Sequence, residues 1–200
     1  MNILVAVASK HSSTRGIAEA IGQELRTSGH TVQVRSANEV EGTGGYDAVI
    51  LGSAIYMGTW LAEARQFVDK NRASLATMPV WLFSSGPLGQ SDPQPHGDFA
   101  HLRELMDATR ARGHRTFVGK LDRSDLGRGE RLVAKVVRAP EGDFRDWEAI
   151  REWAREIAVD LRRDVQGDNT GHCLGGEAGI TQRSERDGND GPAQGAAGLL

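Results

Sequence analysis

Two hydrophobic patterns alternate along roughly the first 160 residues of the chain. Runs of consecutive apolar residues are typical of strands buried on both faces of a parallel sheet, and apolar residues at helical spacing are typical of amphipathic helices. The first pattern predicts five strands, at residues 2–8, 31–35, 47–51, 80–83 and 115–119. The second predicts helices at residues 60–71, 99–112 and 146–161, and a first helix that carries Ile17, Ala18, Ile21 and Leu25 and ends before Gly29. This alternation favours an α/β fold with a doubly wound five-stranded parallel sheet, in the strand order 2-1-3-4-5.

The chain is expected to form one domain followed by a tail. The amphipathic helix at residues 146–161 closes the domain, which we place at residues 1–163. Residues 164–200 are Gly-rich and hold few large apolar side chains, so we expect a disordered tail there. Residues 120–142 form a charged insertion with a short apolar stripe, and the sequence leaves its conformation open.

Composition narrows the classes of function. The net charge is −3 with acidic and basic residues interleaved, so the chain lacks the broad cationic face that nucleic-acid binding requires. The single cysteine, Cys173, excludes a disulfide framework, and no ligand spacing predicts a metal site. The apolar run at the N-terminus is too short for a signal peptide or a membrane span. We therefore expect a cytoplasmic protein with no integral membrane segment; peripheral membrane contact and the oligomeric state stay open.

Ligands of doubly wound sheets bind beyond the carboxyl ends of the strands, near the point where the strand order reverses. The loops after the first, third and fourth strands are therefore the candidate site. The first of these loops consists of Ser9, Lys10, His11, Ser12, Ser13 and Thr14. Its four hydroxyl groups, together with the backbone N–H groups of a helix N-terminus, predict a phosphate site. The alternative is that one serine merely caps the helix.

The other two loops suit a flat heterocycle. The loop after the third strand includes Ser53, Ala54, Ile55, Tyr56, Met57, Gly58 and Trp60. Its aromatic and thioether side chains can contact a planar ring, although Trp60 and Met57 could instead begin the core of the next helix. The loop after the fourth strand consists of Ser84, Ser85, Gly86, Pro87, Leu88 and Gly89. Its backbone can hydrogen-bond a ring edge, and the alternative is an ordinary turn. Taken together, the three loops predict a mononucleotide site.

Four segments of the chain resemble a known family. They are ILVAVASKHSSTRGIAEAIGQEL, YDAVILGSAIYMGTWLAEARQFV, MPVWLFSSGPLG and GDFRDWEAIREWAREIA, and they fall within residues 2–162. They are similar to the flavodoxin-domain family that includes the menaquinone-dependent protoporphyrinogen IX dehydrogenases (oxidases). The resemblance implies a flavodoxin-like fold and non-covalent FMN, with the phosphate in the loop at 9–14 and the isoalloxazine ring against residues 56–60 and 85–89. The family usually has glycine where this chain has Ser12, and a serine in a left-handed conformation would cost about 1 kcal/mol.

Three functions follow from these features. The first is an FMN-dependent oxidoreductase, similar to the quinone-linked protoporphyrinogen oxidases, that passes reducing equivalents from a porphyrinogen-like donor to a quinone acceptor. The flavin would carry this chemistry, so no side chain is assigned a catalytic role. The second is a flavodoxin-type electron carrier. The third is a flavodoxin-like binding module that lacks the cofactor.

Overall fold

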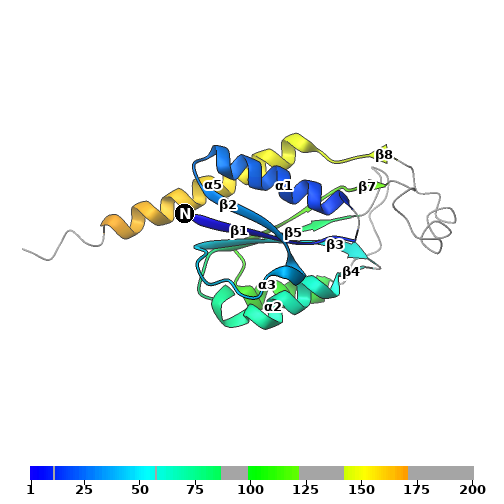
Figure 1. Cartoon of the computed structure of the whole chain (residues 1–200), viewed down its shortest axis with the longest axis horizontal. Coiled ribbons are helices and arrows are strands. Elements are labelled where there is room, and N and C mark those ends of the chain that lie inside the picture. The colour runs from blue at the N-terminus through cyan, green and yellow to red at the C-terminus, as the bar shows by residue number, and fades with distance from the viewer. Residues whose placement is uncertain (11, 57, 87–98, 122–141, 171–200) are drawn as a thin grey trace, which may run out of the picture.

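The computed structural model describes residues 1–10, 12–56, 58–86, 99–121 and 142–170. At its centre lies a parallel sheet with strand order β2-β1-β3-β5-β6, which Figure 1 shows between two layers of helices. This order confirms the predicted doubly wound arrangement of five parallel strands. The strands are β1 (Asn2–Ala8), β2 (Thr31–Ser36), β3 (Ala48–Tyr56), β5 (Val80–Ser85) and β6 (Gly113–Phe117).

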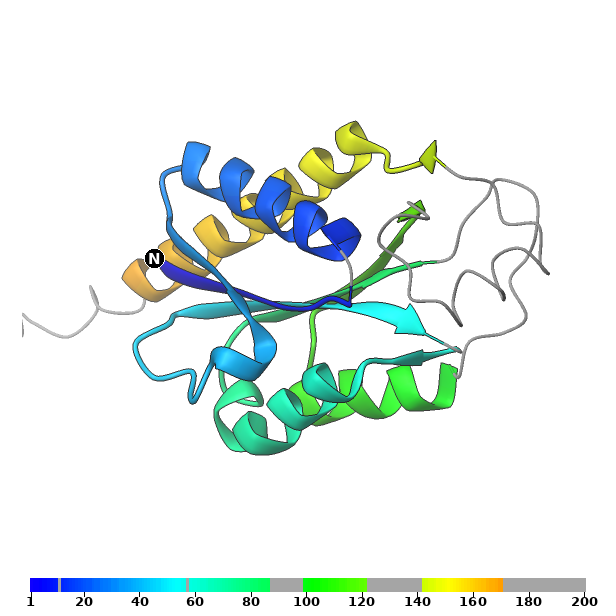
Figure 2. The same ribbon diagram turned by 45° about the vertical axis from the view of Figure 1, so that its right-hand side comes forward.

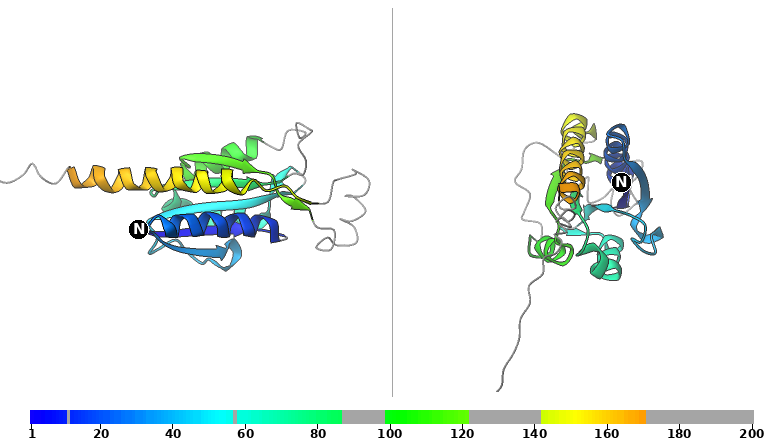
Figure 3. Two further views of the ribbon diagram at one scale, coloured as in Figure 1. Left: turned by 90° about the horizontal axis from the view of Figure 1, so that it is seen from above. Right: turned by 90° about the vertical axis from the view of Figure 1, so that its left-hand side faces the viewer.

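Two pairs of helices cover the sheet. The helices α1 (Ser12–Thr27) and α5 (Trp147–Thr170) run side by side over one face (Figure 3), and α2 (Ala62–Leu75) and α3 (Phe99–Thr109) cover the other. Successive residues of a strand point to opposite faces of a sheet. In β1, Ile3 and Val5 accordingly belong to the apolar core under α1 and α5, whereas Leu4 and Ala6 belong to the core under α2 and α3. This explains why the strand reads as one continuous apolar run.

The third strand is longer than predicted. Small residues at Gly52 and Ser53 suggested that the strand ends at residue 51, but β3 continues to Tyr56 and turns back as β4 (Thr59–Trp60). Glycine at position 52 is required because a Cβ atom there would overlap the Phe83 ring of the neighbouring strand. The residue therefore serves close packing inside the sheet and does not end the strand. The prediction that a helix begins at residue 60 is wrong, since α2 begins at Ala62.

Other element ends differ from the predictions by smaller amounts. The strand β6 begins at Gly113 instead of residue 115, and α3 ends at Thr109, followed by Arg110 with a φ of +50°. The first helix ends as predicted, with Gly29 just beyond it at a φ of +92°. A glycine after a helix takes this left-handed conformation without steric cost.

The last helix runs beyond its predicted end at residue 161. It continues to Thr170, so the first residues of the expected tail at 164–200 are helical, and residues 171–200 lie outside the described part of the chain. Two short strands, β7 (Lys120–Leu121) and β8 (Gly142–Asp143), pair antiparallel and bring the two ends of the insertion together. Most of the insertion, residues 122–141, is also outside the described residues. A short 3-10 helix, η1 (Ala37–Glu39), follows β2.

Candidate functional site

The loops after β1, β3 and β5 lie at one edge of the sheet, the edge at which these parallel strands end (Figure 2). Lys10 of the first loop places its ammonium nitrogen 4.1 Å from the centroid of the Tyr56 ring, which belongs to the second loop. A Cβ atom on Gly119 would lie 3.2 Å from the Ser13 hydroxyl oxygen and 3.4 Å from that of Ser85. The first and third loops therefore meet at Gly119, and the described parts of all three predicted loops lie close together.

The hydroxyl groups of the first loop do not all share one role. Thr14 is buried, and the Ser13 hydroxyl oxygen accepts a hydrogen bond of 2.7 Å from the backbone nitrogen of Lys120. These two residues hold the loop in place. Ser9 is half-buried and Ser12 is exposed, and with Lys10 they line a polar cavity of about 360 Å³. His11 lies outside the described residues.

The electrostatics of this cavity favour an anion on the side of α1. The first turn of α1 contains no acidic residue. No side chain of that turn therefore neutralises the positive end of the helix dipole. Arg15 adds a second cation to the cavity wall, where it donates a 3.2 Å hydrogen bond to Ser36. Glu39 and Glu63 line the cavity as well. An anion is therefore best placed against the first loop.

Ser12 has an ordinary backbone conformation. Among the described residues, Arg110 is the one non-glycine with a positive φ. The predicted cost of a left-handed serine at position 12 is therefore wrong. The loop turns here without needing glycine, and the substitution adds a hydroxyl group at the helix N-terminus without backbone strain.

Sequence reasoning missed Arg145, whose side chain contacts the backbone of the first loop. Its guanidinium donates to the backbone oxygen of Ser13 at 3.4 Å, and it stacks on the Trp147 ring, 4.2 Å from the ring centroid. Two further hydrogen bonds, of 2.8 and 2.5 Å, join it to the Asp143 carboxylate and hold the pKa of that group below its ordinary value. A Cβ atom on Gly16 would overlap the guanidinium, so a larger residue there would displace the Arg145 side chain from this position. The sequence signal was the run DFRDW before the last helix.

The second loop is a tight hairpin between β3 and β4. Tyr56 and Thr59 face each other across it, and Gly58 adopts a φ of +81° that favours glycine. Tyr56 is the exposed aromatic side chain of the hairpin, with 43% of its surface accessible. A planar ring can therefore stack on Tyr56. Met57 lies outside the described residues.

Ser53, Ala54 and Ile55 shape the base of this hairpin. The buried Ser53 hydroxyl donates to the Ala54 carbonyl oxygen at 2.9 Å and accepts from the Leu61 backbone nitrogen at 3.0 Å. It thus ties the end of β3 to the start of α2. Ala54 and Ile55 are half-buried. These three residues hold the backbone of the site in position.

Trp60 packs in the core and does not offer a stacking surface. It is 4% exposed and belongs to the apolar cluster under α2 and α3. Its indole nitrogen donates a 2.8 Å hydrogen bond to the Ser84 hydroxyl, which lies 2.8 Å from Nε2 of His114. Of the two interpretations that the sequence left open for Trp60, the structure supports the one in which it packs in the core. His114 is a second residue that sequence reasoning missed.

The third loop begins with two buried serines. Ser84 is held by Trp60 and His114, and Ser85 is 4% exposed. The backbone nitrogen of Gly86 donates to the Phe117 carbonyl oxygen at 3.2 Å. Pro87, Leu88 and Gly89 lie outside the described residues, so their predicted contacts with a ring edge stay predictions.

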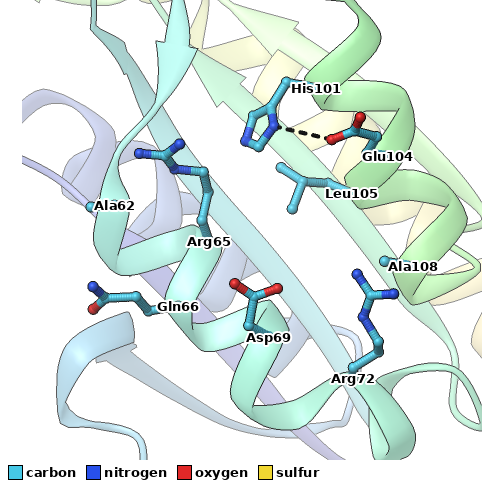
Figure 4. A pocket seen from close by; sticks show the side chains of 9 residues that line it. All are labelled: Ala62, Arg65, Gln66, Asp69, Arg72, His101, Glu104, Leu105 and Ala108. Carbon is cyan, nitrogen blue, oxygen red and sulfur yellow. Dashed lines mark ion pairs between the residues drawn. The ribbon is translucent and has the colours of Figure 1, made fainter.

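A separate groove of about 340 Å³ lies between α2 and α3 (Figure 4). Arg65 and His101 point toward each other across it, and His101 lies 3.5 Å from the Glu104 carboxylate. None of the predicted site residues lines this groove. The described segments contain no group of acidic, histidine or cysteine side chains that could hold a metal ion, and none of their helices is long and apolar enough to cross a membrane.

The fold and the three loops define a class of protein. The model of the flavodoxin domain family matches residues 4–147, and the chain belongs to this family. Membership implies a flavin cofactor.

Particular relatives add detail. Protoporphyrinogen IX dehydrogenase [quinone] of Escherichia coli strain K12 is 25% identical over 175 residues, covering 79% of this chain and 95% of the relative. The flavodoxin of Nitratidesulfovibrio vulgaris is 27% identical over 110 residues, covering 55% of each chain. An archaeal flavodoxin structure superimposes with a TM-score of 0.55 at 19% identity, covering 81% of this chain and 99% of that one, which shows the common fold.

Proposed function

We propose that this protein binds FMN and catalyses the transfer of reducing equivalents from a porphyrinogen-like donor to a quinone. The observation that carries the proposal is the junction of three loops at one sheet edge, where anion-binding groups lie next to an exposed aromatic ring. A phosphate and a flat heterocycle are the two parts of FMN that such a site has to hold.

The residues present fit a flavin mononucleotide. The hydroxyl groups of Ser9 and Ser12, the Lys10 ammonium and the first N–H groups of α1 form a donor set for a phosphate monoester. Tyr56 would offer one face to the isoalloxazine ring, and we expect the loop after β5 to meet the ring edge. When bound, FMN supplies a ring that accepts two electrons and a proton from one substrate and passes them to another.

The overall reaction sets what the two substrates must exchange. The donor loses two electrons and two protons for each new double bond, and the quinone takes the same two electrons and two protons to become a quinol. The protein's part is to hold the ring, exclude competing acceptors and stabilise negative charge that develops near the ring edge. None of these tasks needs a nucleophilic side chain.

The quinone-linked oxidoreductase is favoured over a simple carrier by the extent of the similarity. The relative from Escherichia coli is matched over 95% of its length, whereas the flavodoxin from Nitratidesulfovibrio vulgaris is matched over 55%. The chain also carries an insertion at residues 120–142, whose two ends pair as β7 and β8. Both features support a substrate beyond a protein redox partner.

The test is an anaerobic turnover assay with the full chain loaded with FMN. Protoporphyrinogen IX is supplied as donor and a soluble naphthoquinone as acceptor, and porphyrin fluorescence is followed. We expect porphyrin to form only when the protein, FMN and the quinone are all present. A protein that binds FMN but gives no quinone-dependent porphyrin formation would contradict the oxidoreductase proposal and leave the carrier function.

A further inference from the structure

Three side chains from three different elements form a buried hydrogen-bonded chain beside the site. Trp60 comes from β4, Ser84 from β5 and His114 from β6. The Ser84 hydroxyl oxygen lies 2.8 Å from the indole nitrogen of Trp60 and 2.8 Å from Nε2 of His114. Trp60 and Ser84 are 4% and 1% exposed, so water cannot replace either bond without disturbing the core.

The direction of the chain follows from the chemistry of its members. An indole N–H can only donate, so the Ser84 oxygen accepts from Trp60. The Ser84 hydroxyl hydrogen then needs an acceptor, and Nε2 of His114 is the partner within hydrogen-bonding distance in the described structure. Nε2 must therefore be unprotonated and the imidazole neutral, with its hydrogen on Nδ1. Burial lowers the pKa of His114, which favours the neutral ring.

The chain joins the parts of the structure that carry the second and third loops. Trp60 pairs with Ile55 in the hairpin that presents Tyr56, and Ser84 is the first residue of the third loop. We propose that His114 is a positioning residue, which holds these two loops in register by accepting the Ser84 hydroxyl hydrogen. The inference rests on the proposed function, because the geometry it maintains is that of the flavin site.

Protonation of His114 would reverse the last bond. Nε2 would become a donor, Ser84 would accept two hydrogen bonds, and its own hydrogen would lose its acceptor in a site from which water is excluded. The hairpin and the third loop would then be less firmly held. We therefore expect flavin affinity to fall when His114 becomes charged.

Other charged groups around His114 do not provide a competing explanation for the expected fall in flavin affinity at low pH. His114 pairs with Leu82, whose side chain lies in the core under α2 and α3, so His114 points toward that layer. The strand β5 carries no charged residue. Arg115 of β6 is bonded to Glu156 of α5 on the opposite face, and Arg112, just before the strand, is bonded to Asp164 of α5. On α3, His101 is paired with Glu104, and Arg103 and Asp107 are exposed.

The experiment compares the wild-type full chain with H114Q and H114L between pH 5 and pH 8. Glutamine can accept the Ser84 hydrogen and does not titrate, whereas leucine cannot accept it. The matched control is H30Q, because burial also lowers the pKa of His30, which lies before β2 at the opposite edge of the sheet. The FMN dissociation constant is measured by flavin fluorescence. Imidazole nitrogen shifts and the Trp60 indole signal are measured by NMR without FMN.

The phosphate of FMN itself takes up a proton near pH 6, which affects binding to every variant. The effect of His114 is therefore measured as the ratio of the FMN dissociation constants of wild type and H114Q. At pH 7.5 we expect H114Q to bind within about 3-fold of wild type and H114L at least 5-fold more weakly. At pH 5 the wild type should bind several-fold more weakly than H114Q, and H30Q should follow the wild type throughout.

The proposal is overturned if the ratio of the FMN dissociation constants of wild type and H114Q stays constant from pH 8 to pH 5. It is also overturned if the NMR shifts show that Nε2 of His114 is protonated at pH 7.5. Should H114L fail to fold, the H114Q profile decides the question. Should no variant bind FMN, the proposed function fails. The positioning role is then tested by whether the Trp60 indole signal moves with the titration of His114 in wild type and stays fixed in H114Q.

Discussion

At the scale of single residues, the site depends on where charge is placed at the start of α1. Ser12 lies in the first turn of this helix and lines the polar cavity with Lys10. A carboxylate at this position would stabilise the helix through its dipole but would repel a phosphate dianion. The two effects have opposite signs, so folding and ligand binding can be separated by one substitution.

We predict that Ser12→Asp weakens FMN binding by at least about 10-fold while the melting temperature stays equal or rises. Ser12→Asn has nearly the same shape without the charge and serves as the control, with binding within about 3-fold of wild type. Flavin fluorescence titration and thermal unfolding measure the two quantities. Equal affinities for the aspartate and asparagine variants would place the phosphate elsewhere.

Tyr56 is the second residue that the account singles out. Its ring is 43% exposed, and the Lys10 ammonium lies over it. We predict that Tyr56→Ala weakens FMN binding by about 5-fold or more and shifts the visible absorption of the bound flavin, because a stacking surface is lost. Tyr56→Phe keeps the ring and should change both quantities little. An unchanged flavin spectrum in the alanine variant would mean that the isoalloxazine ring contacts another surface.

The residues of the first loop show how far sequence reasoning reaches. A cluster of four hydroxyls at a strand end predicted an anion site, and the loop does lie at the correct edge of the sheet. The sequence could not show which of these hydroxyls hold the loop and which face a ligand. The Ser13 hydroxyl accepts a hydrogen bond from Lys120, which lies more than a hundred residues later in the chain. That division depends on tertiary contacts, which spacing along the chain does not record.

At the scale of elements, the last helix and the short strand before it support the first loop. Arg145 has 11% of its side chain exposed and connects Asp143, Trp147 and the backbone of Ser13. We predict that Arg145→Met lowers the free energy of unfolding by about 1–3 kcal/mol and weakens FMN binding, since the first loop loses its support. The control is Arg151→Met in α5, which removes an exposed i,i+3 ion pair with Glu148 worth less than about 1 kcal/mol.

The Arg145–Asp143 pair also predicts a dependence of stability on pH. Because Arg145 lowers the pKa of Asp143 in the folded protein, the pair contributes stability above the ordinary carboxyl pKa, and this contribution disappears as the pH falls through the lowered value. The stability difference between wild type and Arg145→Met should therefore be largest above about pH 4 and shrink below it. Urea unfolding at several pH values measures it. A difference that stays constant down to pH 2 would contradict this account.

The elements also show which signals in the sequence were sufficient. The strand β1 has its predicted ends, because a continuous apolar run flanked by polar residues leaves little choice. The strand β3 was predicted to be too short, since Gly52 and Ser53 look like a strand end unless the Phe83 ring beside them is known. Trp60 was likewise predicted to begin a helix, although it lies in β4, which pairs with the end of β3. Packing against a neighbouring strand, which no local pattern encodes, decided both cases.

At the scale of the whole molecule, the doubly wound topology brings distant segments to one edge of the sheet. The described residues among 9–14, 53–60 and 84–86 meet there because β1, β3 and β5 are neighbours in the sheet and point the same way. This part of the site could be predicted, since the alternation of strands and helices favours a doubly wound sheet, whose ligands bind beyond the carboxyl ends of the strands. The contributions of Arg145 and His114 could not, because they come from the last helix region and an edge strand that carry no ligand motif.

The central claim is that the first loop binds the phosphate of FMN at this edge. The most direct test is a titration of the full chain, freed of any flavin, with FMN and with riboflavin, which lacks the phosphate. The account predicts that FMN binds at least about 10-fold more tightly than riboflavin and that the preference is lost in Ser12→Asp. Equal affinities for the two flavins, or no binding of either, would contradict it.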